Sequence, residues 1–111
     1  MPLQIVKPQI AAGQSLSAVV DGTTGEMLAI TIPINWTPAN LSFQVSADGN
    51  NYYDVVDDFG KEITRTAVAG TALTLGMESQ WKGMHIKLRS GSRDWPVKQI
   101  DDVEFTVAIA T

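Results

Sequence analysis

The sequence contains no cysteine and only one histidine, His85, among its 111 residues. The lack of cysteine excludes disulfide bonds, thiolate metal ligands and cysteine nucleophiles. A single histidine leaves acid–base catalysis near neutral pH with few candidate groups, and any metal site would have to rest on carboxylates. The composition therefore favours a protein that is not an enzyme and has no cofactor.

Positive charge is also scarce, because eight Lys and Arg stand against twelve Asp and Glu and the formal net charge is −4. Binding to nucleic acid relies on a basic surface that neutralises phosphates, so nucleic acid is not an expected partner. No apolar run approaches the ~20 residues that span a bilayer, and residues 1–8 lack the pattern of a secretory signal. We therefore expect no membrane association and expect synthesis in a cytoplasm.

Short alternations of apolar and polar residues recur along the chain. Leu41–Ser46, Met84–Ser90 and Val103–Ile109 each place apolar side chains on one face, the period of a half-buried strand. Weaker strand candidates are 4–6, 16–20, 27–32, 52–56, 62–66 and 71–75, and 75–81 allows one short helical turn. Turn dipeptides separate these stretches: Asp21-Gly22, Asp48-Gly49, Phe59-Gly60, Ala69-Gly70, Lys82-Gly83 and Ser90-Gly91.

This pattern predicts an all-β fold, a single-domain antiparallel β-sandwich of the jelly-roll type. A chain of 111 residues can bury one core but not two. We assign residues 13–111 to the sandwich and residues 1–12 to an extended N-terminal arm, because two prolines bracket its apolar residues and disfavour a central strand. Such an arm gains stability by lying on another surface, so its apolar residues are candidates for partner contact: Leu3, Ile5 and Val6.

Four acidic residues cluster between the strand candidates: Asp54, Asp57, Asp58 and Glu62. Converging carboxylates can bind calcium, but the spacing differs from a calcium loop of the EF-hand type, in which glycine is sixth. Gly60 is seventh when counted from Asp54. We therefore interpret these acids as solvated side chains that cap turns, with metal binding as the alternative. His85 is expected to be a surface or interface side chain.

The three tryptophans are the side chains best able to anchor a partner or stack on a sugar. We expect Trp36 and Trp81 to lie in the core, as indoles of small domains usually do. Trp95 differs, because it lies in the polar stretch Ser90–Pro96, where a large apolar side chain is harder to bury. Burial and exposure at an interface are both compatible with that loop, and Trp95 is the best single candidate for partner contact.

Three blocks of sequence occur in order: Ile32–Ala39; then Leu41–Gly49 with Tyr53-Asp54 and Gly60–Glu62; then Leu88–Gly91 with Pro96–Gln99. Together with Gly13–Ser17, these blocks resemble a family of small uncharacterised proteins encoded among the virion-structure genes of tailed bacteriophages and prophages. The resemblance covers most of the chain. Separately, Ser46-Ala47-Asp48-Gly49 followed by an aromatic residue is similar to the strand-turn signature of discoidin-like, galactose-binding jelly rolls, where the turn is structural.

The phage resemblance implies a non-enzymatic structural protein of the virion, foremost a capsid decoration or head-fibre protein. Such proteins act in many copies through multivalent surface contacts. The implied partners are other virion proteins, the major capsid protein first among them, and further copies of the same chain in a homo-oligomer. A tail or baseplate accessory protein is an alternative, and so is a carbohydrate-binding module that attaches the particle to a host or glycan surface.

Overall fold

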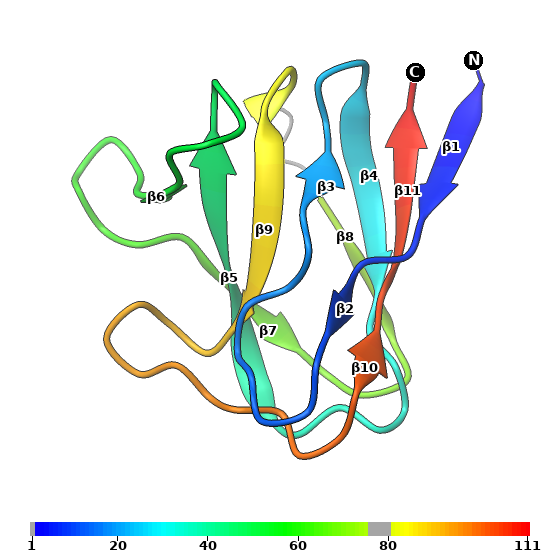
Figure 1. Cartoon of the computed structure of the whole chain (residues 1–111), viewed down its shortest axis with the longest axis vertical. Coiled ribbons are helices and arrows are strands. Elements are labelled where there is room, and N and C mark those ends of the chain that lie inside the picture. Colours follow the sequence, from blue (N-terminus) through cyan, green and yellow to red (C-terminus); the bar gives the residue numbers. More distant parts are fainter. Residues whose placement is uncertain (1, 76–80) are drawn as a thin grey trace.

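The computed structural model describes residues 2–75 and 81–111, and it confirms the all-β prediction (Figure 1). All strand pairs in the described residues are antiparallel. The strands are β1 (Leu3–Val6), β2 (Gln9–Ile10), β3 (Val20–Asp21), β4 (Glu26–Thr31), β5 (Ala39–Ser46), β6 (Tyr53–Asp54), β7 (Thr64–Ala67), β8 (Ala72–Thr74), β9 (His85–Ser90), β10 (Val103–Glu104) and β11 (Thr106–Ala110).

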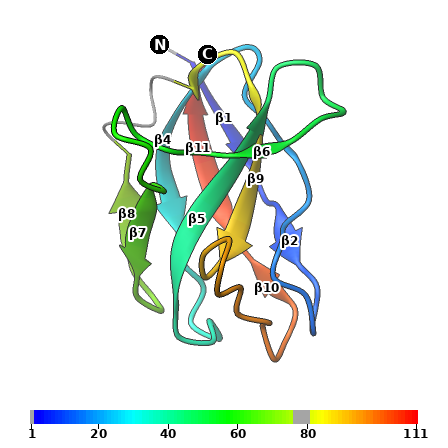
Figure 2. The ribbon, with the colours of Figure 1, turned by 90° about the vertical axis from the view of Figure 1, so that its left-hand side faces the viewer.

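These strands form the two layers of a sandwich. One layer is the sheet β1-β11-β4-β8, extended at one end by the pair β2-β10, and the other is β3-β9-β5-β6, with β7 also paired to β5. Figures 1 and 2 show β5 beside β9 in one layer and β4 beside β11 in the other. Among the described residues, no helix has the length and hydrophobicity needed to cross a membrane.

The strand order is that of a jelly roll. Three pairs of strands, β1 with β2, β6 with β7 and β10 with β11, each occupy one strand position in two pieces. Counted in this way, the eleven strands found in residues 2–75 and 81–111 occupy eight strand positions. The orders in the two layers are then first-eighth-third-sixth and second-seventh-fourth-fifth. Two Greek keys folded together give this order, so the predicted jelly-roll type is confirmed.

The core lies between the layers and contains most of the apolar residues of the predicted alternations, although Met84 is half-buried and lies outside it. Val103, Phe105, Val107 and Ile109 are all buried, as the C-terminal pattern predicts. The predicted burial of both core tryptophans is also confirmed, since Trp36 packs edge-on against Phe105 and Trp81 packs against Phe43. The expected helical turn at 75–81 lies mainly on residues 76–80, outside the described residues.

The turn after β5 follows its sequence signature. One Oδ of Asp48 accepts hydrogen bonds from the backbone N–H groups of Asn50 and Asn51, at 2.8 and 2.9 Å. Gly49 takes the left-handed conformation with φ +80°, which is unfavourable for residues that have a Cβ. His85 is half-buried. Its ring lies next to this turn, since a Cβ built on Gly49 would be 3.2 Å from His85 Nε2.

The N-terminal residues belong to the sandwich and do not form a separate arm, which corrects the expected boundary at residue 12. Residues 3–6 pair with β11, and residues 9–10 pair with β10. Both ladders share one continuous register, from Leu3 opposite Ala110 to Ile10 opposite Val103. The prolines are compatible with this because β1 is an edge strand, where a missing N–H is tolerated.

Candidate binding surface

Arg89 is the most unexpected buried residue. The alternation in β9 places it with His85 and Lys87 on the outer face of the sheet, where a charged side chain is expected to reach water. The residue is only 6% exposed. Its guanidinium donates hydrogen bonds from Nε to Ser42 Oγ at 2.9 Å, from Nη1 to Asp54 Oδ1 at 2.6 Å and from Nη2 to Glu62 Oε2 at 2.5 Å.

Each acceptor of Arg89 comes from a different part of the fold. Ser42 is the register partner of Arg89 across β5 and β9. Asp54 is carried by β6, opposite Gln44 of β5. Glu62 lies at the neck of the loop that joins β6 to β7, where it is bridged to Val56. The guanidinium therefore fastens the outer face of the five-stranded sheet to the 55–63 loop.

The acidic cluster thus divides into two kinds of side chain, which corrects the expectation that all four acids are solvated. Asp54 and Glu62 are partners of Arg89, with side chains that are 29% and 13% exposed. Asp57 does cap a turn, as expected. Within residues 2–75 and 81–111, no three His, Asp or Glu side chains are grouped so that they could hold a metal ion.

Asp54 is ionised in this arrangement. Burial alone raises the pKa of Asp54, but the hydrogen bond and the positive charge of Arg89 outweigh it and hold the pKa below 3.8. A buried ion pair contributes little net stability, because both charges lose their hydration. The clearer consequence is that the two charges depend on each other, since removing one of them leaves the other buried without a partner.

Glu62 also connects two loops. Besides binding Arg89, its Oε2 accepts a hydrogen bond from the backbone N–H of Arg93 at 3.1 Å. Arg93 lies in the 91–97 loop that follows β9, whereas Glu62 closes the 55–63 loop. Both loops lie on the left of Figure 1, the side that faces the viewer in Figure 2. One carboxylate thus positions two neighbouring loops.

Phe59 lies at the tip of the first loop and is 94% exposed. The backbone around it is fixed, because Asp57 Oδ1 accepts hydrogen bonds from the N–H groups of Phe59 and Lys61 at 2.9 and 3.0 Å. The N–H of Gly60 also binds the carbonyl of Asp57 at 3.0 Å. The ring is therefore held out into solvent by a hydrogen-bonded turn.

Trp95 is 81% exposed at the tip of the second loop, so the structure places this candidate at the surface. The N–H of Trp95 donates to Ser92 Oγ at 3.1 Å, and its carbonyl accepts from the N–H of Ser92 at 3.2 Å. Gly91 has φ +90°, and a Cβ there would collide with the carbonyl oxygen of Trp95. The loop is therefore tightly closed below the indole.

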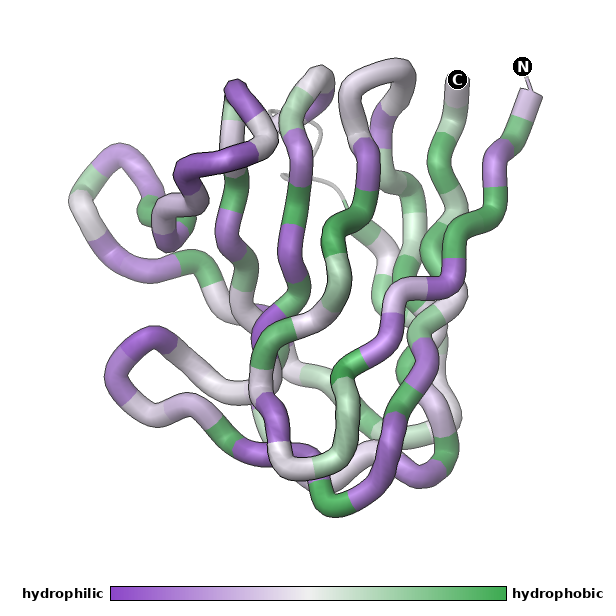
Figure 3. Tube along the Cα trace, viewed as in Figure 1, coloured by the Kyte–Doolittle hydropathy of each residue, from purple (hydrophilic) through white to green (hydrophobic). Residues whose placement is uncertain are grey.

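We call the side formed by these two loops, with Phe59 and Trp95 at their tips, the loop surface. The remaining residues of both loops are mostly hydrophilic, as Figure 3 shows. Isolated exposed apolar residues are common on proteins, but two large aromatic side chains on fixed, linked loops are typical of the anchors of a binding interface.

The other three candidate residues lie elsewhere. Leu3 and Ile5 are 60% and 52% exposed on β1, and Val6 is half-buried against the core. In Figure 1, β1 is on the right, across the molecule from the two loops. The structure therefore does not bring the N-terminal candidates together with Trp95, and the chain presents two separate surfaces.

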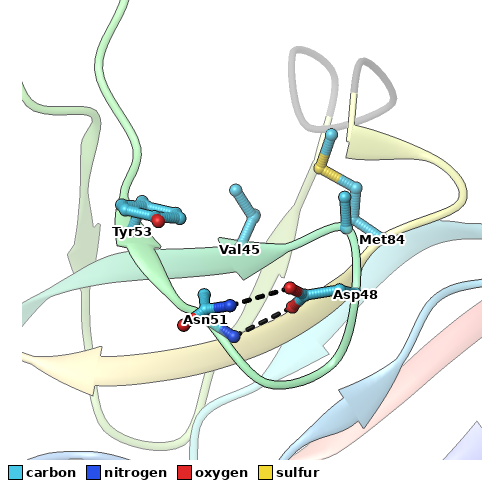
Figure 4. A pocket seen from close by; sticks show the side chains of 6 residues that line it. Val45, Asp48, Asn51, Tyr53 and Met84 are labelled. Atoms are coloured by element: carbon cyan, nitrogen blue, oxygen red, sulfur yellow. Dashed lines mark hydrogen bonds between the residues drawn. The ribbon is translucent and has the colours of Figure 1, made fainter.

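A shallow pocket of about 270 Å³ lies beside the turn after β5 (Figure 4). Val45, Asp48, Asn51, Tyr53 and Met84 line it, and the combination of an aromatic ring with polar groups resembles a sugar site. However, the polar groups already serve the turn. Hydrogen bonds from the backbone N–H groups of Asn51 and Asn50 hold the pKa of Asp48 below its ordinary range, and the Asn51 amide donates to its second oxygen at 2.8 Å.

Sequence reasoning identified Trp95 but not Phe59 or Arg89. Phe59 satisfies the criterion applied to Trp95, a large apolar residue within a polar turn, and that criterion could have identified it. The signal for Arg89 is weaker: a charged residue in a strongly alternating strand, in a chain with an acidic cluster. Neither position nor spacing says which acids it meets.

No protein-family model matches this chain, and no curated protein or solved structure compared with it does so either.

Proposed function

We propose that the protein is a non-enzymatic structural component of a tailed-phage virion, a capsid decoration or head-fibre protein that binds its neighbours through the loop surface. The sequence resemblance supplies the phage setting. The exposure of Phe59 and Trp95 on linked, hydrogen-bonded loops is the observation that carries the binding role. Burying two such rings against a partner removes a large apolar area from water.

The fixed backbone of both loops favours this role. Ordering flexible loops on binding costs free energy, and a surface that is already ordered avoids most of that cost. Three charged residues flank the two rings: Asp58, Arg93 and Asp94. Aromatic anchors surrounded by polar and charged groups are the usual anatomy of a protein interface. On a symmetric particle, moderate affinity at each copy is multiplied by multivalency.

The test uses the phage or prophage that encodes the chain, with its own copy of the gene deleted and a variant supplied in trans. We expect Phe59→Ala and Trp95→Ala each to lower the number of copies per purified particle about tenfold or more when sites are not saturated. Ile34→Ala is the matched control, because Ile34 is 89% exposed on the β4–β5 loop, outside the loop surface. Unchanged copy number for both aromatic variants would refute the proposal.

Separating heads from tails before counting copies distinguishes the two structural roles. Copies that remain with the heads favour decoration or head-fibre function, and copies that remain with the tails favour the accessory alternative. Carbohydrate binding is the other alternative, and the pocket beside Tyr53 is the feature that favours it. Binding of the purified protein to a glycan array, abolished by Tyr53→Ala and unaffected by Trp95→Ala, would replace the structural proposal with that one.

A further inference from the structure

β1 presents an open edge whose hydrogen-bonding groups can be assigned. The N–H of Thr111 donates to the carbonyl of Pro2 at 3.1 Å, and the N–H of Phe105 donates to that of Pro8 at 3.0 Å. Antiparallel pairs alternate between hydrogen-bonded and non-hydrogen-bonded positions. In this register, the backbone groups of Gln4 therefore face β11, and those of Leu3 and Ile5 face away from the sheet.

The same edge is used farther along the strand. The carbonyl of Gln9, which has the same outward orientation as those of Leu3 and Ile5, accepts a hydrogen bond from the N–H of Ala18 at 3.0 Å. On the side of β1 that faces away from β11, the described part of the chain supplies no strand. The edge is thus competent for pairing, covered at residue 9 and open at residues 3 and 5.

The usual protections of an open edge are missing from β1. Natural edges carry charged residues, prolines or bulges within the strand, whereas β1 reads Leu-Gln-Ile-Val and its register with β11 is uninterrupted. Its exposed side chains continue a face with little charge, because Ile5 lies opposite Ala108, which in turn lies opposite Ala29. Leu3 lies opposite Ala110, and Glu26 follows Ala110 across β4.

The low charge of this outer face indicates which partner β1 can pair with. Glu26 is the one charged side chain of the described strand residues on the outer face of that sheet, although the chain carries a net charge of −4. Two copies repel each other over most of their acidic surfaces, but they can approach here without that repulsion. The edge is also complementary to itself, since a two-fold axis places the same donors and acceptors opposite one another.

We propose that β1 pairs antiparallel with β1 of a second copy, which joins the two four-stranded sheets into one sheet across a two-fold axis. The outward groups of Leu3 then exchange hydrogen bonds with those of Ile5 in the partner copy, and Ile5 does so with the partner's Leu3. Gln4 lies on the axis opposite itself, in a non-hydrogen-bonded pair. Leu3 and Ile5 become cross-strand neighbours on the outer face.

This dimer does not depend on the proposed virion function. The loop surface is on the other side of the molecule and stays free, so a dimer presents two copies of it (Figure 1). The dimer can therefore form when partner binding through the loops fails, and the reverse also holds.

The first experiment is sedimentation equilibrium of the full chain across the micromolar range. We expect the weight-average mass to rise with concentration from 12.0 kDa towards twice that value. Ile5→Lys places a charge on the pairing edge and should keep the protein monomeric. Ile34→Lys, at a site that is 89% exposed elsewhere, should dimerise like the wild type. A wild-type protein that stays monomeric throughout, or an Ile5→Lys variant that still dimerises, overturns the proposal.

The second experiment tests the register, and it remains decisive if Ile5→Lys does not fold. Because the chain has no cysteine, Gln4→Cys introduces a single thiol. On the axis its Cα would lie about 4.5 Å from that of the partner copy, within the Cα separations at which a disulfide can form. We expect oxidation to dimerise Gln4→Cys about tenfold faster than Leu3→Cys, the off-axis control one residue away. Equal rates for the two variants contradict the pairing.

Discussion

Arg89 Nη2 and Glu62 Oε2 are 2.5 Å apart, although the two residues are separated by 27 positions in the chain. The guanidinium comes from a central strand, and the carboxylate comes from the neck of a surface loop. Because the same carboxylate binds the backbone of Arg93, the position of both loops of the loop surface depends on this contact. The pair is therefore a link between the rigid sheet and the exposed aromatic rings.

Replacing Arg89 should strongly destabilise the fold. Arg89→Met leaves Asp54 and Glu62 partly buried without a counter-charge, which costs about 3 kcal/mol of unfolding free energy. Arg89→Lys should be nearly as harmful, because one ammonium group does not reproduce the planar fork that meets three acceptors. Urea unfolding measures both, with Arg93→Met as the exposed control, where a change of about 0.5 kcal/mol or less is expected. An Arg89→Met variant as stable as the wild type would mean that the network is misassigned.

The stability of the protein should fall in acid partly through Asp54. The pKa of Asp54 in the folded state lies below 3.8, so near that pH the unfolded state binds more protons than the folded state does. The stabilising contribution is complete well above pH 3.8 and is lost as the pH falls through the folded pKa. Asp54→Asn should therefore flatten the decline of unfolding free energy below about pH 5. In an Arg89→Met background, the same substitution should have little effect on the slope.

The periodicity of the sequence predicts the core well, because one buried face per strand is a local property. Leu41 and Phe43 of β5 point inward, as their alternation predicts. Ser42 and Ser46, predicted on the outer face, are nevertheless buried. Alternation tells which side chains share a face, but it does not tell what covers that face. Arg89 lies against Ser42 and donates a hydrogen bond to its Oγ. Ser46 instead bonds to Asp48 and Gly49 of the turn that follows β5.

Long-range pairing explains the error at the N-terminus. Local composition, with two prolines near the start, favoured an extended arm over a central strand, although residues 4–6 have the pattern of a strand. The strand forms because Leu3 meets Ala110 at the other end of the chain, and no local pattern encodes that meeting. Exposure of Trp95 was open for a similar reason, since it depends on a loop closed by Ser92 and on the position of Glu62.

The closure of the 91–97 loop predicts a difference between two glycines. Gly13 and Gly91 both have positive φ, +79° and +90°, so an alanine at either position has an unfavourable backbone conformation. A Cβ on Gly13 has open space, whereas one on Gly91 meets the backbone of Trp95, Pro96 and Val97. Gly91→Ala should therefore reduce the unfolding free energy by about 1–3 kcal/mol more than Gly13→Ala does. The melting temperature of Gly91→Ala should accordingly be clearly lower. Equal shifts would show that the loop can open at no cost.

The exposure of Trp95 predicts a distinct fluorescence behaviour. Trp36 and Trp81 are 5% and 7% exposed, so the indole of Trp95 should account for nearly all quenching by acrylamide in the folded protein. Trp95→Phe should remove the quenchable, red-shifted part of the emission and leave the melting temperature almost unchanged, since the ring contributes little to the core. On binding through the loop surface, the wild-type protein should lose this quenching, because a buried anchor is shielded from solvent. If quenching persisted at full occupancy on particles, Trp95 would lie outside the interface, and the contact would have to be sought on another part of the molecule.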